Sequence, residues 1–168
     1  MMDEARFQTF YELTARPLYA YLLRLTGDRS LSDDISQEAF IRMLQRELDD
    51  PSDAKLKSYL FTTATNLCRD HWRSRRTVDW ESGSGADRGS NVQEREVDLR
   101  HTIETAFEDL TPQQRSLVWL SYVEGYSHRE VASMLEVKEK SVRVLLFRAK
   151  KKLSGVLTAI GIGKEDLL

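Results

Sequence analysis

The sequence predicts an all-α fold: two small helical domains, of three and then four helices, joined by a flexible linker. Three observations predict it. Apolar side chains recur at spacings of three and four in the long hydrophobic stretches, as they do on one face of a helix. Helix-start signatures stand at Thr111 and Ser127. One polar stretch rich in glycine and serine, residues 77–94, separates the two groups, and no stretch shows a convincing strand pattern.

The first helix is predicted over residues 5–25. Pro17 interrupts this helix and is expected to kink it or divide it near Ala15 and Arg16, because proline removes one intrahelical hydrogen bond. Gly27 ends it. Its apolar positions are Phe7, Phe10, Tyr11, Leu18, Tyr21, Leu22 and Leu25.

A second helix, capped by Ser30 or Ser32, is predicted to run to about Glu47. The loop 49–53 has turn chemistry, and a third helix follows over residues 54–76. The apolar stripe of the second helix is Ile35, Ala39, Phe40, Met43 and Leu44, and that of the third includes Leu56, Leu60, Phe61, Ala64, Leu67 and Trp72.

The C-terminal half begins with a helix predicted over residues 95–108, and three more helices follow between 110 and 153. Thr111 precedes a proline and stands three residues before Gln114, and Ser127 stands three residues before Glu130, so each starts a helix. A longer helix starts near Lys138. This short helix, tight turn and longer basic helix form a helix-turn-helix, whose second helix can enter a DNA major groove. Its expected core positions are Val142, Leu146, Ala149 and Leu153.

The net charge of −2 conceals an uneven distribution of charge. Residues 138–152 hold seven basic side chains against one acid, and residues 69–76 hold four against one. Acidic residues gather elsewhere, notably at 47–53 and 79–98. Two separate cationic faces on an acidic body indicate two nucleic-acid contacts, and the alternative is that they are solvated helix surfaces.

Length and composition argue against a membrane protein and against a secreted, disulfide-bonded protein. With 168 residues, the chain suffices for one ordinary domain or two small ones. It has neither the run of about 20 apolar residues that a membrane span needs nor a signal-peptide pattern. A single cysteine, Cys68, cannot form an internal disulfide. We therefore expect a cytoplasmic chain without membrane insertion, in which Cys68 is a buried structural thiol.

Two stretches of the N-terminal half narrow the function. Asp34, Gln37 and Phe40 follow a D-x-x-Q-x-x-F spacing. Downstream, a polar, cationic helix face holds Asn66, Arg69, Asp70, Arg73 and Arg76. Together the two stretches resemble region 2 of bacterial sigma factors, and the C-terminal half resembles region 4. The resemblance is closest to the small extracytoplasmic-function (ECF) class of the sigma-70 family, and it covers about residues 7–76 and 98–153.

The resemblance implies a domain organisation and partners. Region 2 would occupy residues 1–76, the linker 77–94, region 4 95–155 and a C-terminal tail 156–168. Such a chain binds core RNA polymerase, at the clamp helices of the largest subunit and in the flap region, and directs promoter-specific initiation. It also implies an anti-sigma factor as a partner. The polymerase-binding residues would be Asp34, Gln37, Glu38 and Arg42.

The resemblance also assigns DNA contacts. Region 2 would recognise and help melt the −10 element, with arginines at phosphates and Asn66 at a base edge. Tyr59 stands where many family members carry tryptophan, and core packing is its alternative role. Region 4 would contact the −35 element, where Arg143 is the candidate for a guanine and the lysines hold phosphates. The −10 set is Asn66, Arg69, Arg73, Arg76 and Tyr59; the −35 set is Lys138, Lys140, Ser141, Arg143, Phe147 and Arg148.

Several residues depart from the family pattern. Glu136 stands where glycine is usual, and Lys138 where a capping serine is common. Val144 and Leu145 replace polar side chains, so the −35 element would be recognised weakly, through thymine methyl groups, or these side chains would pack on a partner. The acidic loop 49–55, at the position of the family's specificity loop, is left without an assigned contact.

Two other functions would make different demands on the sequence. A stand-alone helix-turn-helix regulator would not need the face around Asp34. A small hydrolase or metal enzyme would need a cluster of titratable groups, but Cys68, His71, His101 and His128 lack metal-ligand spacing. We therefore expect a non-enzymatic chain without metal or cofactor.

Overall fold

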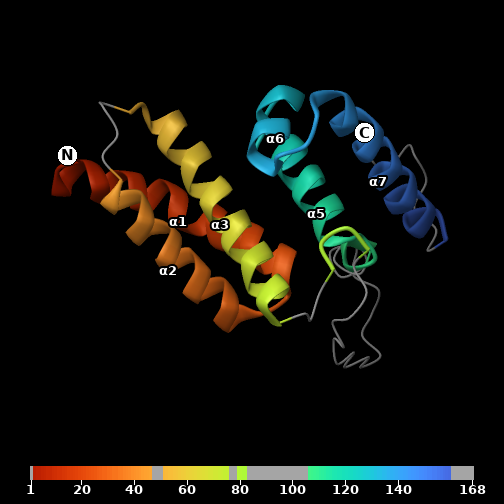
Figure 1. The fold of residues 1–168 in the computed structure, drawn as a ribbon, viewed down its shortest axis with the longest axis horizontal. Coiled ribbons are helices and arrows are strands. Elements are labelled where there is room, and N and C mark those ends of the chain that lie inside the picture. Colours follow the sequence, from red (N-terminus) through yellow and green to blue (C-terminus); the bar gives the residue numbers. More distant parts are fainter. Residues whose placement is uncertain (1, 47–50, 76–78, 83–105, 160–168) are drawn as a thin grey trace.

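The computed structural model describes residues 2–46, 51–75, 79–82 and 106–159. Within these ranges the protein is helical and contains no strand, as the sequence predicts. Helices α1, α2 and α3 form an N-terminal group, and α5, η1, α6 and α7 form a C-terminal group (Figure 1).

Helix α1 spans Glu4–Thr26. The Asp3 carboxylate accepts a hydrogen bond from the Arg6 N–H at its start, and Gly27 ends it with a left-handed φ of 68°. Pro17 lies inside this helix without dividing it, so the predicted break near Ala15 is absent. The helix continues because five apolar side chains anchor both of its halves in the core: Phe10, Leu18, Tyr21, Leu22 and Leu25.

Helix α2 spans Arg29–Gln45 and α3 spans Asp53–Arg75. The cap of α2 is Asp28, whose carboxylate accepts from the Leu31 N–H, so the predicted caps Ser30 and Ser32 are wrong. Both serines lie inside the helix, which starts one turn earlier than the apolar pattern suggests. Leu44 was also assigned to the core wrongly: it is 49% exposed on the outer face of α2.

The C-terminal group contains α5 (Pro112–Val118), the π-helix η1 (Trp119–Val123), α6 (His128–Leu135) and α7 (Glu139–Ala159). Both predicted capping boxes are present, Thr111 with Gln114 and Ser127 with Glu130. The helix predicted over residues 95–108 lies outside the described residues except for 106–108, which are helical. At the other end, α7 continues past the predicted region boundary into the first residues of the tail.

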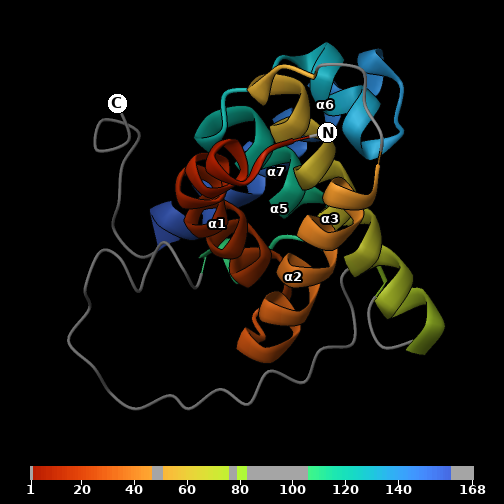
Figure 2. The ribbon, with the colours of Figure 1, turned by 90° about the vertical axis from the view of Figure 1, so that its left-hand side faces the viewer.

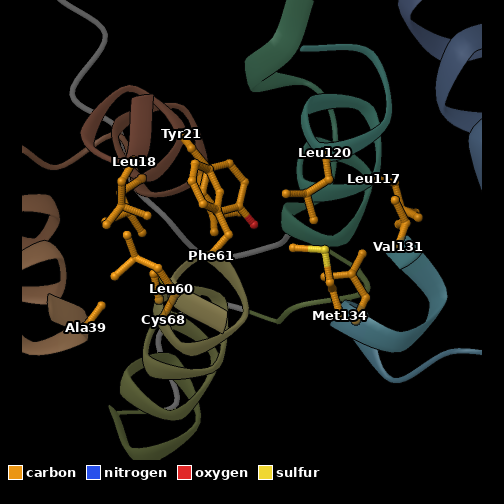
Figure 3. Packing of buried hydrophobic residues seen from close by; sticks show 14 of the residues in the cluster. Leu18, Tyr21, Ala39, Leu60, Phe61, Cys68, Leu117, Leu120, Val131 and Met134 are labelled. Atoms are coloured by element: carbon orange, nitrogen blue, oxygen red, sulfur yellow. The ribbon is translucent and has the colours of Figure 1, made fainter. Parts of the chain in front are cut away.

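The two groups pack directly against each other. Helix α1 contacts α5, and α3 contacts α6; viewed from the side of the N-terminal group, α5 lies behind α1 and α3 (Figure 2). Figure 3 shows the rings of Tyr21 and Phe61 between the groups, with Leu120 and Met134 across from them. One hydrophobic cluster therefore runs through both halves of the chain.

Polar contacts also join the groups. The Tyr21 hydroxyl donates to Ser116 Oγ at 2.9 Å and lies 2.7 Å from Thr65 Oγ1. The Arg115 guanidinium, 4% exposed, donates to the Leu25 carbonyl at the end of α1 at 3.1 Å, and also to the carbonyls of Phe107 and Glu108. A cation at a helix C-terminus meets the negative end of the helix dipole. These contacts make the interface specific in register as well as apolar.

Among the described residues, none of the helices combines the length and the apolar character needed to span a bilayer. The helices instead carry their apolar side chains on one face, towards the shared cluster.

Candidate nucleic-acid interface

Helix α2 presents a polar outer face. Asp34, Gln37 and Arg42 are exposed, and the Arg42 guanidinium pairs with the half-buried Glu38 at 2.9 Å, one helical turn away. Two apolar side chains that the sequence did not single out as surface residues, Ile41 and Leu44, lie exposed on the same helix. Their position after the D-x-x-Q motif on the same helix is the sequence feature that could have identified them. The face therefore combines charge with apolar area, as a helix-docking surface does.

Helix α3 carries the predicted −10 residues, and they differ in exposure. Asn66 and Arg69 are half-buried, whereas Arg73 is exposed and lies 4.0 Å from the carboxylate of Asp70. Arg76 lies outside the described residues. An exposed pair at that distance contributes little to stability, so Arg73 is free to move towards a phosphate.

Arg69 is engaged with other parts of the chain. Its guanidinium carbon lies 4.8 Å from the centre of the Trp80 ring, and Nη1 donates to the Leu135 carbonyl, the end of α6, at 3.4 Å. The sequence could not reveal these contacts, because the partners lie 11 and 66 positions away.

Tyr59 is half-buried and packs against the core, and the Arg46 guanidinium carbon lies 4.6 Å from the centre of its ring. The packing role expected as the alternative for this side chain is present in the structure. One part of the ring packs inside, and the other faces a cation beside the start of the acidic loop.

The acidic loop is partly tied down. Residues 47–50 lie outside the described residues. At its end, the Arg6 guanidinium donates to the Pro51 carbonyl at 2.6 Å and pairs with the Asp53 carboxylate at 3.2 Å. The charge of Asp53 is thus partly offset by α1, which lowers the repulsion that a nearby phosphate would meet.

Helix α7 has one buried and one exposed face. Val142, Leu146 and Ala149 are buried against α5 and α6, as predicted. The opposite face is cationic with apolar side chains between the charges; Val144 is 48% and Phe147 67% exposed. The predicted −35 residues Lys138, Lys140, Arg143, Phe147 and Arg148 are exposed, and Ser141 is half-buried. This arrangement suits a helix that inserts into the major groove of DNA, between the negatively charged phosphates.

The turn before α7 is strained at one residue. Glu136 has a φ of 55°, the left-handed region that favours glycine, and its N–H donates to the carbonyls of Ala132 and Ser133. The turn geometry is therefore the one that the usual glycine would give, and an L-residue holds it at an energetic cost. Beside this turn lies an open groove of about 740 Å³, whose lining includes Glu81, Gln113, Lys138, Lys140, Val144, Leu145 and Arg148.

Candidate groups for catalysis or metal binding do not converge in the described part of the chain, where no cluster of three His, Cys, Asp or Glu side chains could hold a metal ion. Cys68 is fully buried, and burial raises the pKa of its thiol. His71 and His128 belong to different helices, α3 and α6, and His101 lies outside the described residues.

Both halves of the chain match known families. Residues 10–78 match Sigma-70 region 2, and residues 100–153 match Sigma-70, region 4. Among solved structures, the sigma factor RpoE of Bartonella quintana, crystallised in complex with the anti-sigma factor NepR, is similar with a TM-score of 0.69 and 22% identity. The similarity covers 90% of this chain and 96% of that one, and at this identity it shows the fold alone.

Relatives match along almost the whole chain. The ECF RNA polymerase sigma factor SigX of Bacillus subtilis is 26% identical over 160 residues, 89% of this chain and 82% of SigX. The ECF RNA polymerase sigma factor SigL of Mycobacterium tuberculosis is 30% identical over 165 residues, 95% of this chain and 93% of SigL. The chain therefore belongs to the ECF sigma factors of RNA polymerase, in the sigma-70 family.

Proposed function

We propose that this protein binds core RNA polymerase and directs promoter-specific initiation of transcription. The observation that carries the proposal is the presence, in one chain, of the α2 docking face and the exposed cationic face of α7. The first fits a protein partner, and the second fits duplex DNA. A stand-alone regulator would need only the second.

In this proposal residues 1–76 act as region 2, 77–94 as the linker, 95–155 as region 4 and 156–168 as the tail. The outer face of α2 docks on the clamp helices of the largest polymerase subunit through Asp34, Gln37, Glu38 and Arg42. The exposed side chains of Ile41 and Leu44 supply apolar area beside these charges.

Helix α3 binds the −10 element. Arg69, Arg73 and Arg76 meet phosphates of the non-template strand, and Asn66 offers an amide to a base edge. Tyr59, with one face of its ring towards Arg46, stacks on an unpaired base. Binding unstacked bases favours the melted promoter, so recognition and opening are one step.

Helix α7 binds the −35 element as double-stranded DNA. Arg143 makes bidentate bonds to a guanine, while Lys138, Lys140 and Arg148 fix the register on phosphates. Ser141 and the exposed Phe147 complete the contact, and Phe147 with Val144 suits thymine methyl groups. The chain itself carries out no bond chemistry; phosphodiester synthesis belongs to the polymerase.

An anti-sigma factor is a further proposed partner, supported by RpoE, whose solved structure is a complex with the anti-sigma factor NepR. The exposed Val144 and Phe147 offer such a partner an apolar contact.

Promoter binding requires the two groups to separate. Arg69 Nη1 lies 3.4 Å from Leu135 O, and Lys138 follows three residues later, so these two members of the proposed DNA faces lie less than about 20 Å apart. Promoter elements two helical turns apart are separated by roughly 70 Å. Core polymerase is the scaffold that would hold the two groups at the longer distance.

The test is in vitro run-off transcription with core polymerase on genomic promoter fragments. Specific initiation that depends on this chain supports the proposal, and Asp34→Ala with Arg42→Ala should weaken it by weakening assembly. An Arg129→Ala variant, an exposed cation on α6, serves as the control. No initiation with active core and no inhibitor would contradict the proposal, and duplex binding without initiation would favour a stand-alone regulator.

A further inference from the structure

Four described residues of the predicted linker form a fixed turn, Asp79–Ser82. The Asp79 carboxylate accepts hydrogen bonds from the backbone N–H groups of Glu81 at 2.9 Å and Ser82 at 3.1 Å. These bonds hold the pKa of Asp79 below its usual value. The shape of the turn is therefore set by its own residues.

The turn bridges the two helical groups. On one side the Trp80 ring lies 6.2 Å from the ring of Trp72, at the buried face of α3. On the other side the Trp80 carbonyl accepts from the Gln113 N–H in the first turn of α5, at 3.0 Å. The ring packs against the core, so the turn is docked between the groups.

Trp80 covers Arg69, which the proposed function assigns to the −10 element. The guanidinium lies 4.8 Å from the ring centre, within the range of a cation–π contact. An arginine uses the same planar face to stack on an aromatic ring and on a nucleobase. The N–H edge of the guanidinium is the part assigned to a phosphate, and its face remains available to stack on the neighbouring base. Trp80 occupies that face, so it competes with the base for Arg69.

Glu81 of the same turn lines the groove that Lys138, Lys140 and Arg148 of the other proposed DNA face also line. Its carboxylate brings a negative charge to this groove, so a DNA phosphate entering the groove would meet its repulsion.

We propose that the turn Asp79–Ser82 is an autoinhibitory contact that imitates nucleic acid, with Trp80 in the place of a base on Arg69 and Glu81 in the place of a phosphate beside α7. The proposal rests on the proposed function of Arg69. DNA binds the free chain only in those molecules whose turn has undocked from Arg69. The apparent Kd is therefore the intrinsic Kd divided by the undocked fraction.

The buried Trp80 N–H makes docking of the turn reversible. Trp80 Nε1 is buried and finds no hydrogen-bond partner among the described residues. A buried N–H without a partner opposes docking, since water would satisfy it once the turn leaves. Core polymerase, by separating the groups, would break the bond between Trp80 and Gln113 and release Arg69.

The test measures binding of the free, full-length chain to a fluorescein-labelled 20-nucleotide single strand of mixed sequence, by anisotropy at low salt. Trp80→Ala should bind about 2- to 30-fold more tightly, the factor that one cation–π contact represents. Trp80→Phe, which keeps a ring, should bind nearly as the wild type. Tyr122→Ala is the matched control, because it removes a ring 4.5 Å from Lys150, a cation without an assigned DNA contact.

A double mutant makes the test specific to Arg69. Arg69→Ala with Trp80→Ala should bind no more tightly than Arg69→Ala alone. A gain that persists without Arg69 would overturn the proposal, because the ring would then act by loosening the chain in general. Unchanged affinity in a folded Trp80→Ala would overturn it as well. If that variant does not fold, Asp79→Ala, which leaves Trp80 present but removes the two bonds that shape the turn, takes its place with the same expected direction.

Run-off transcription separates this proposal from the one on which it rests. If Arg69→Ala leaves promoter-specific initiation unchanged, the role of Arg69 is wrong and both proposals about this residue fall. If Arg69→Ala impairs initiation while Trp80→Ala binds single strands no better than the wild type, only the autoinhibitory contact is wrong.

Discussion

Cys68 and Tyr21 are fully buried ionisable side chains, and burial raises the pKa of both. For Tyr21 the hydrogen bonds to Ser116 and Thr65 oppose this shift only in part. Each group stays protonated in the folded chain when the unfolded chain has begun to lose its proton. The stability that these groups contribute is therefore complete below their unfolded pKa values and is lost above them.

We predict that the free energy of unfolding falls as the pH rises above about 9, where an unfolded cysteine ionises, and falls more steeply above about 10, where an unfolded tyrosine follows. Each group adds a slope of about 1.4 kcal/mol per pH unit. Urea titrations between pH 8 and 11 measure it. Cys68→Ala should lose only the first component, and a flat profile would contradict the prediction.

Glu136 and Gly125 both have left-handed backbones, with φ values of 55° and 75°, and only one of them is glycine. Glu136→Gly should raise the free energy of unfolding by about 0.5–1 kcal/mol, because relief of the strain exceeds the added entropy of the unfolded chain. Thermal unfolding followed by circular dichroism measures it.

Gly125→Ala is the matched control, at a left-handed position that glycine occupies. A Cβ there meets no heavy atom within 4 Å, so any change reports backbone strain alone. It should destabilise the protein by about 1 kcal/mol. Two changes of the same sign would contradict the interpretation.

Two features of α2, its capping residue and the exposure of Leu44, could not be predicted from the sequence. Ser30, Ser32 and Asp28 all favour a helix start, and the local pattern does not decide between them. Leu44 continues an apolar spacing, yet it is exposed. Periodicity identifies the apolar positions of a helix but not how much of that face its neighbours cover.

At the scale of elements, the helix starts are the most predictable part of this fold. The two capping boxes were evident because both partners stand three residues apart. We predict that Ser127→Ala destabilises the protein by about 1 kcal/mol, since the Glu130 N–H loses its acceptor. Ser133→Ala, an exposed serine inside the same helix α6, should be near neutral in the same urea titration. Equal losses in the two variants would mean that the cap contributes nothing.

Helix α7 should separate sequence readout from phosphate binding. In holoenzyme binding to a promoter duplex, Arg143→Ala should cost about 1–3 kcal/mol and relax the preference at one base pair. Lys138→Ala should weaken all sequences equally and reduce the salt dependence of log K by about one. Affinities measured over a range of salt concentrations distinguish the two, and identical effects would contradict the assigned roles.

At the scale of the whole molecule, the contacts between the two helical groups hold the chain closed. We predict a coupling energy of about 0.5–1.5 kcal/mol between Tyr21→Phe and Ser116→Ala, because their hydrogen bond crosses the interface. A double-mutant cycle in urea measures it. Tyr21→Phe with Ser133→Ala should be additive, and additivity in the first cycle as well would mean that the groups unfold independently.

The closed packing could not be predicted from the sequence, although most of the helices could. Periodicity identifies which face of a helix is apolar, but not which helix covers it. The polar contacts across the interface are single residues, such as Arg115 and Glu124, and have no repeating pattern. Glu124 pairs with Lys57 at 2.8 Å from a position 67 residues away. Only the folded chain brings such partners together.

The order of synthesis gives the interface a further consequence. Helices α1 to α3 are complete at residue 75, whereas α5 ends 43 residues later, at residue 118. At 5–20 residues per second a ribosome takes roughly 2–9 s over that interval. During this time the rings of Tyr21 and Phe61 and the carbonyl of Leu25 lack their partners from the C-terminal group. Every newly made molecule therefore passes through an open state before it first closes.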